Sequence, residues 1–81
     1  MKNIRMYKLN LENLGDIGLI SQTQYKKALG LSADYVNRIF TNKLAIKLST
    51  AKCLISLAYN ISVRDSEQMQ ELLEKHFIIV K

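Results

Sequence analysis

The chain has 81 residues, which is enough for one small domain and not for two. Hydrophobic residues make up 48% of it and charged residues 23%, a composition that indicates a folded globular protein and excludes a disordered one. The longest uncharged apolar runs, such as FIIV at residues 77–80, are too short to cross a bilayer, and no apolar stretch of signal-peptide length follows Lys2 and Arg5. We therefore expect a cytoplasmic protein without a membrane partner.

The net charge of +5 is distributed unevenly along the chain. Residues 1–52 carry nine Lys and Arg against three Asp and Glu, whereas residues 53–81 carry three against four. A basic first part joined to a slightly acidic end is typical of a protein with one surface that faces a polyanion such as nucleic acid. The simpler alternative is that these lysines only hydrate the surface.

The first 30 residues contain a segment of loosely alternating apolar and polar residues, followed by a segment with the start and stop residues of a helix. Residues 3–11 alternate between apolar and polar side chains and predict either a short strand or the run into a first helix. After a break at two glycines, SQTQYKKALG predicts a helix over residues 21–29. Ser21 and Gln24 can form a capping box at its start, and Gly30 supplies the left-handed residue that ends such a helix.

A second helix is predicted over residues 33–42, with Ser32 as its N-cap. At 100° per residue its side chains divide into two faces. The apolar face consists of Tyr35, Val36, Ile39 and Phe40. The polar face consists of Asp34, Asn37, Arg38 and Thr41. One side of this helix therefore serves the core, and the other is available for contacts.

The rest of the chain also predicts helices. Ser49 is expected to cap a helix over residues 49–59, which ends at Asn60. Ser62 is expected to open a last helix over residues 62–77, after which the apolar, β-branched tail FIIV closes the chain.

These elements predict an all-α fold class, a small bundle of four to five short helices that contains a helix-turn-helix, with short terminal strands as an option. Two short helices joined by a glycine-containing turn of a few residues define that motif, and the turn at residues 30–32 joins the first two helices here. We expect a single domain over residues 1–81, with its core in residues 9–61 and a C-terminal helix and tail in residues 62–81.

On this spacing, the stretch from Ser21 to Val63 resembles the Cro/C1-type (Xre-like) helix-turn-helix domains of phage repressors and their bacterial relatives. SQTQ, ALGLS, YVNRI and NK stand where that family has TQ-x-x-LA, LG(V/I)S, IS-x-IE and GK, and LISLAYNISV resembles its later L-x-x-LA-x-ALGVSV. The resemblance covers about half of the chain. It implies a domain that binds double-stranded DNA, and small phage repressors of this type bind as dimers.

Together with the polar face of the second helix, the resemblance indicates which residues contact DNA. The implied DNA-binding residues are Gln22, Ser32, Ala33, Asp34, Asn37, Arg38, Thr41 and Lys43. Three further lysines are candidates for phosphate contacts, although surface lysines are common in any protein: Lys26, Lys27 and Lys47. Lys26 stands where the family usually has a small alanine under the crossing helix. This larger residue implies that the two helices pack against each other differently than in the family.

The chemistry of the polar face suits the major groove of DNA, where every base pair shows a distinct pattern of donors and acceptors. Asn37 can pair bidentately with adenine, and Arg38 can pair with guanine or a phosphate. Asp34 can accept a hydrogen bond from cytosine but repels a nearby phosphate. The alternative is that Asn37 and Arg38 are solvated residues of an ordinary amphipathic helix.

Neither catalysis nor a bound cofactor or metal is expected. The sequence contains no P-loop, HExxH or GxGxxG motif, and its single histidine and single cysteine exclude most acid-base and thiol chemistry. Cys53 has no partner for a disulfide or a zinc site, and His76 lies on the apolar stripe of the last predicted helix. We therefore expect both to be packing residues and the chain not to be an enzyme.

The last helix and the tail supply the candidates for homodimerisation. These apolar side chains are Met69, Leu72, Leu73, His76, Phe77 and Ile79. Strand pairing by residues 77–80 or 4–9 would add to such an interface. The alternative is that the last helix only completes the core.

Two functions follow from these observations. The first is a small, sequence-specific transcriptional repressor of phage or mobile-element type that binds DNA as a homodimer. The second is a protein-binding inhibitor built on the same fold, because some phage proteins that resemble this family are anti-CRISPR or anti-repressor factors. Asp34 on the polar face and the departure at Lys26 lend some weight to this second function, which is the alternative to DNA binding.

Overall fold

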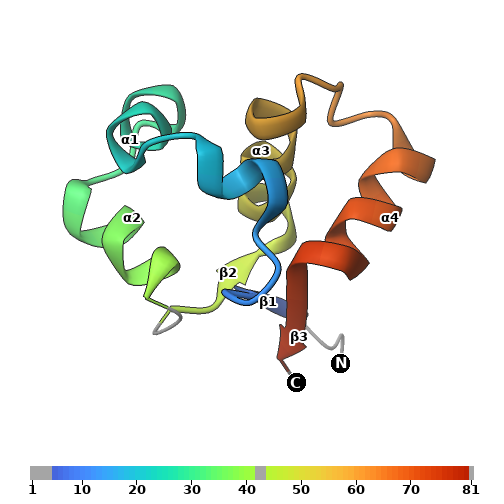
Figure 1. Ribbon diagram of the computed structural model, residues 1–81, viewed down its shortest axis with the longest axis horizontal. Coiled ribbons are helices and arrows are strands. Elements are labelled where there is room, and N and C mark those ends of the chain that lie inside the picture. Colours follow the sequence, from blue (N-terminus) through green and yellow to red (C-terminus); the bar gives the residue numbers. More distant parts are fainter. Residues whose placement is uncertain (1–4, 42–43, 81) are drawn as a thin grey trace.

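A computed structural model describes residues 5–41 and 44–80 of the chain (Figure 1). In chain order its elements are β1 (Met6–Leu9), the 3-10 helix η1 (Gly15–Leu19), α1 (Gln22–Leu29), α2 (Ala33–Phe40), β2 (Ile46–Lys47), α3 (Leu48–Tyr59), α4 (Ser66–His76) and β3 (Phe77–Val80). Figure 1 shows α1 and α2 at one end of the long axis, α3 in the middle and α4 at the other end, with the strands along one edge.

The three strands form one antiparallel sheet in the order β2-β1-β3. Met6 of β1 is paired with Val80 of β3 on one side and with Lys47 of β2 on the other. The all-α fold class is therefore wrong, and the fold is a mixed one that is rich in helix. Residues 77–80 do pair as a strand, but their partner is β1 of the same chain.

The start signals of the first two helices and the stop signal of the first are confirmed, whereas the second helix ends at Phe40 and not at residue 42. Ser21 and Gln24 form the capping box of α1: the Ser21 Oγ accepts from the Gln24 backbone N–H at 3.2 Å, and the Gln24 Oε1 accepts from the Ser21 N–H at the same distance. Gly30 ends α1 in the left-handed conformation, with φ of +66°. Ser32 caps α2 by accepting a hydrogen bond from the Tyr35 N–H. The turn between the helices is thus fixed by short-range hydrogen bonds.

The predicted caps of the last two helices are wrong. Helix α3 begins at Leu48, directly after β2, and its N-cap residue Lys47 makes no side-chain capping bond. Helix α4 is capped by Asp65, which accepts from the Gln68 N–H at 3.2 Å, while the Ser62 Oγ accepts from the Arg64 N–H one turn earlier. Because β2 runs directly into α3 and a turn precedes α4, neither helix has its predicted serine, Ser49 or Ser62, as its N-cap.

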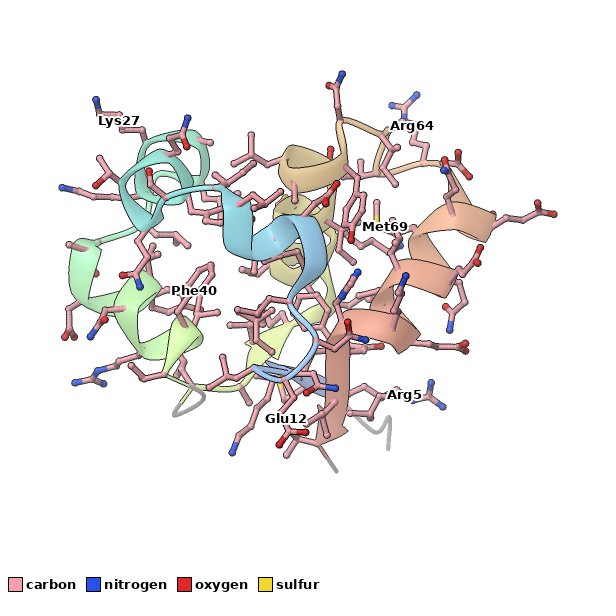
Figure 2. The ribbon with its side chains drawn as sticks, viewed as in Figure 1. Arg5, Glu12, Lys27, Phe40, Arg64 and Met69 are labelled. Atoms are coloured by element: carbon pink, nitrogen blue, oxygen red, sulfur yellow. The ribbon has the colours of Figure 1, made fainter. Side chains whose placement is uncertain are left out.

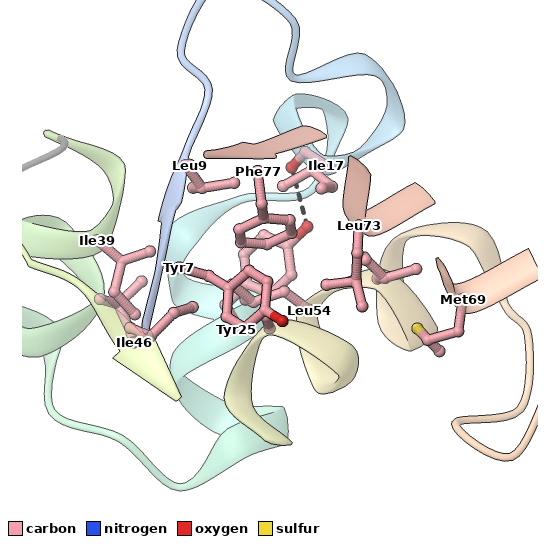
Figure 3. Close-up of a cluster of buried hydrophobic side chains, with 13 residues drawn as sticks. Tyr7, Leu9, Ile17, Tyr25, Ile39, Ile46, Leu54, Met69, Leu73 and Phe77 are labelled. Carbon is pink, nitrogen blue, oxygen red and sulfur yellow. Dashed lines mark hydrogen bonds between the residues drawn. The ribbon is translucent and has the colours of Figure 1, made fainter. Parts of the chain in front are cut away.

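The core draws on every element of the described chain, so it is wider than the predicted range of residues 9–61. Buried residues reach from Tyr7 in β1 to Phe77 in β3, and these two rings pack edge to face with centroids 6.3 Å apart. Figure 3 shows Leu73 of α4 beside the rings of Tyr7 and Phe77, with Met69 farther along the same helix. The C-terminal segment therefore completes the core of the single chain.

Tyr25 lies at the centre of the core and is fully buried. Its hydroxyl donates to the Ile17 carbonyl oxygen at 2.9 Å, which ties α1 to η1 (Figure 3). Its ring packs at 5.3 Å from that of Phe40 in α2. Burial, and to a smaller extent the nearby Tyr59, raise the pKa of the Tyr25 hydroxyl well above its usual value.

This raised pKa predicts that the free energy of unfolding falls as the pH rises above about 10, because the unfolded chain then loses the Tyr25 proton and the folded chain keeps it. Chemical denaturation between neutral and alkaline pH measures the fall. Tyr25→Phe should show a shallower fall, and at neutral pH it should cost about 1–3 kcal/mol because the Ile17 carbonyl loses its donor. Parallel pH profiles of the two proteins would contradict the assignment.

Candidate nucleic-acid interface

Helix α2 presents its polar face to solvent. Asp34, Asn37 and Arg38 are exposed, whereas Val36 and Ile39 are buried in the core. The division into two faces that the sequence predicted is therefore present. Helix α4 lies at the opposite end of the molecule, so the C-terminal segment does not cover this face (Figure 1).

Four of the predicted DNA-binding residues line one shallow hollow of about 350 Å³. They are Asp34, Asn37, Arg38 and Thr41, with Leu44 beside them. Among the described residues, the Asn37 side-chain amide has no hydrogen-bond partner, so its donor and acceptor are both available to a ligand. The Thr41 hydroxyl donates to the Arg38 carbonyl oxygen at 3.1 Å.

Arg38 and Asp34 form an ion pair on this face, with 3.1 Å between the Arg38 Nε and the Asp34 Oδ2. Both side chains are well exposed, so the pair adds little to stability. It occupies one donor of the guanidinium and leaves the terminal nitrogens available. The pair also lowers the positive charge at the centre of the face.

The remaining predicted DNA contacts lie at helix termini and on α1. Gln22 and Ala33 are the exposed first residues of α1 and α2, and Ser32 is the N-cap between them. Lys26 and Lys27 are exposed in the last turn of α1, and Figure 2 shows Lys27 reaching away from the helix.

One predicted lysine lies away from this surface, and another cannot be placed on it. Lys47 lies at the end of β2 and lines a different groove, against α3 and α4. Lys43 lies outside the described residues.

The structure places most of the proposed dimerisation residues in the core of one chain. Met69, Leu73, His76 and Phe77 are buried there, and Leu72 is half-buried. Ile79, by contrast, is 47% exposed on β3. The helical stripe therefore completes the core, and only the strand residue remains open for an interface.

His76 is buried and joins three segments of the chain. Its Nδ1 lies 2.6 Å from the Asn13 carbonyl oxygen, and because a carbonyl only accepts, Nδ1 carries the proton. The Nε2 lies 2.6 Å from the Tyr59 hydroxyl and accepts from it in this tautomer. Both ring nitrogens thus bind partners within the protein, as expected for a packing residue.

The structure also brings together residues that the sequence reasoning did not connect with one another. Arg5 and Tyr7 line one groove with Lys47 and Lys52, although the two pairs lie at opposite ends of the first 52 residues. The excess of basic residues in that part of the chain was the available signal. It gave no indication that these three cations meet.

No protein family, curated protein or solved structure matches this chain. Within residues 5–41 and 44–80, no helix has the length and apolar content needed to span a membrane. In the same residues, no group of three or more His, Cys, Asp or Glu side chains could hold a metal ion.

Proposed function

We propose that this protein binds double-stranded DNA sequence-specifically and acts in the cytoplasm as a small repressor of phage or mobile-element type. The observation that carries the proposal is the pair α1 and α2, joined by the Gly30 turn, with Asn37 and Arg38 exposed on the outer side of α2. A helix with a free amide and a guanidinium on its outer face suits base edges in the major groove. Lys26 and Lys27 on α1 would supply phosphate contacts that do not depend on sequence.

Selection of bound sequences from random duplex DNA tests this function directly. A recovered consensus, and an affinity that falls steeply with salt, would support it. Asn37→Ala and Arg38→Ala should each relax the preference at one base pair and cost about 1–3 kcal/mol of binding free energy. An equal loss on all sequences would reassign the residue to a phosphate contact.

A matched control is available for the arginine. Arg64 is exposed in the turn before α4, at the far end of the molecule from α2 (Figure 2). Arg64→Ala removes the same charge and should leave both affinity and base preference unchanged. A loss as large as that of Arg38→Ala would mean that net charge alone drives binding.

We propose further that the repressor is a homodimer paired through β3. This strand lies at an edge of the sheet, so one row of its backbone N–H and C=O groups has no strand partner among the described residues. Ile78 and Ile79 are 49% and 47% exposed there, and the strand carries no charged residue that would oppose pairing. Two copies related by a two-fold axis would form one continuous sheet with the α2 helices toward its outer ends.

Sedimentation without DNA tests the dimer. The wild-type chain should be dimeric at tens of micromolar, and Ile79→Lys should shift it to a monomer because a charge then lies at the pairing edge. Leu19→Lys, at an 81% exposed leucine of η1, is the control and should remain dimeric. A wild-type chain that is monomeric at these concentrations would contradict the proposal.

The second candidate is a protein-binding inhibitor, which the ion pair between Arg38 and Asp34 favours. A carboxylate at the centre of the face repels DNA phosphates and suits a partner with its own charged side chains. Asp34→Ala separates the two functions. If α2 binds DNA, the substitution should strengthen binding to duplex DNA. If the protein binds a protein target instead, the substitution should weaken that binding and should produce no binding to duplex DNA.

A further inference from the structure

A groove of about 710 Å³ lies between the end of β2, the start of α3 and the side of α4. It is separate from the hollow on α2, and the two share no lining residue. Its volume is within the range of pockets that hold small organic ligands, about 300–1,000 Å³. Its lining combines cationic, hydroxyl and apolar side chains.

Three cations line this groove: Arg5, Lys47 and Lys52. No carboxylate lies among the described lining residues, and the ion pair that the described chain contains joins Arg38 to Asp34 elsewhere. Lys52 is half-buried, which weakens the screening of its charge by water. Three like charges along one groove repel one another, so a bound anion would relieve that repulsion.

Tyr7 supplies an independent sign of a ligand. As a whole residue Tyr7 is only 7% exposed, and its hydroxyl makes no hydrogen bond with any residue that the structure describes. Buried hydroxyls normally have a partner, because leaving one without costs about 1–3 kcal/mol. The ring extends from β1 toward Leu73, and Tyr7 lines the groove (Figure 3). A ligand oxygen in the groove would give this hydroxyl a partner.

The start of α3 adds donors at the same place. Its N-cap, Lys47, makes no capping bond, and its first turn contains no acidic residue. The first backbone N–H groups of a helix have no partner within the helix and carry a partial positive charge. Ser49, which is exposed in this first turn, also lines the groove. The site is thus rich in donors and cations, and the exposed side chain of Leu48 gives it an apolar part.

We propose that this groove binds a small organic phosphate of nucleotide size. The phosphate groups lie among Arg5, Lys47 and Lys52 and accept from the Tyr7 hydroxyl, and the apolar or aromatic part of the ligand packs against Leu48, which is 38% exposed. A phosphate fits better than a carboxylate, because it offers more acceptor oxygens and a second charge to a site with three cations. The inference does not depend on the proposed DNA binding.

Titration of the isotope-labelled full chain with AMP, ATP, naphthyl phosphate, pyrophosphate and adenosine, followed by amide NMR shifts, tests the site. The organic phosphates should give saturable shifts centred on Tyr7, Ser49, Lys52 and Leu73, with ATP tighter than AMP, while adenosine gives none. Tyr7→Phe should weaken binding roughly fivefold and leave the melting temperature unchanged or higher, since the hydroxyl has no protein partner. The double variant Lys47→Ala/Lys52→Ala should weaken it by at least about tenfold.

The matched control is Lys26→Ala/Lys27→Ala, which removes two charges from α1 and should keep the affinity within about twofold. An equal loss in this control would overturn the site, since binding would then follow net charge. The absence of saturation with every organic phosphate at millimolar concentration would also overturn it, as would unchanged affinity in Tyr7→Phe. If duplex DNA displaces the phosphates, and the groove variants weaken duplex binding equally, the groove belongs to the DNA-binding surface and the proposal fails.

Discussion

Replacing Gly15 by alanine is expected to lower the free energy of unfolding by about 2–5 kcal/mol. Gly15 has a φ of +53°, a left-handed conformation that costs a residue with a Cβ about 1–2 kcal/mol. A Cβ at this position would also lie 2.7 Å from the His76 Cε1 and 2.8 Å from the Tyr59 Oη. These two side chains are joined by the hydrogen bond between the Tyr59 hydroxyl and the His76 Nε2. Neither side chain can therefore move aside without breaking it.

Gly30→Ala is the control that separates backbone strain from the clash. Gly30 has a similar φ of +66°, but no atom lies within 4 Å of an added Cβ. This substitution should therefore cost only about 1–2 kcal/mol. Thermal unfolding compares the two, since 1 kcal/mol corresponds to roughly 4–8 °C in a domain of this size. Equal melting temperatures for the two variants would show that the contacts of Gly15 contribute nothing.

Leu54→Ala is the second change with a large expected effect, about 2–5 kcal/mol. Leu54 is completely buried in α3, between the sheet and α1, and its truncation removes apolar contacts and leaves a cavity (Figure 3). A chain of this length has a total stability of about 4–12 kcal/mol, so the variant would lose a large share of it. Denaturation with urea should show a lower midpoint with a similar slope.

Leu19→Ala makes the same chemical change at an exposed position of η1. It should alter the free energy of unfolding by no more than about 0.5 kcal/mol. A comparable loss in both variants would mean that Leu54 is not part of a close-packed core in solution.

The parts of the fold that depend on neighbouring residues could be predicted from the sequence. The capping box of Ser21 and Gln24, the stop at Gly30 and the cap at Ser32 act within four residues, so the boundaries of α1 follow from local chemistry. The two faces of α2 follow from helical periodicity alone. Its end was predicted two residues too late, since α2 ends at Phe40.

The parts that depend on distant residues could not be predicted. β1 pairs with β3 from the opposite end of the sequence, and β2 has only two residues, too few for any alternation to be visible. The start of α3 depends on where β2 ends, which is why Ser49 was mistaken for the cap. The groove lined by Arg5, Tyr7 and Lys52 exists only because the sheet brings these residues to α3 and α4.

The central position of β1 has a consequence for the order of folding. β1 is synthesised before both of its partners, and β3 follows it only after all the helices of the described chain have been made. The helical hairpin before β2 can form early from local contacts, whereas closing the sheet requires the slow meeting of distant segments. Until then Tyr7 and Leu9 remain uncovered, so a nascent chain stalled before β3 should be prone to aggregation.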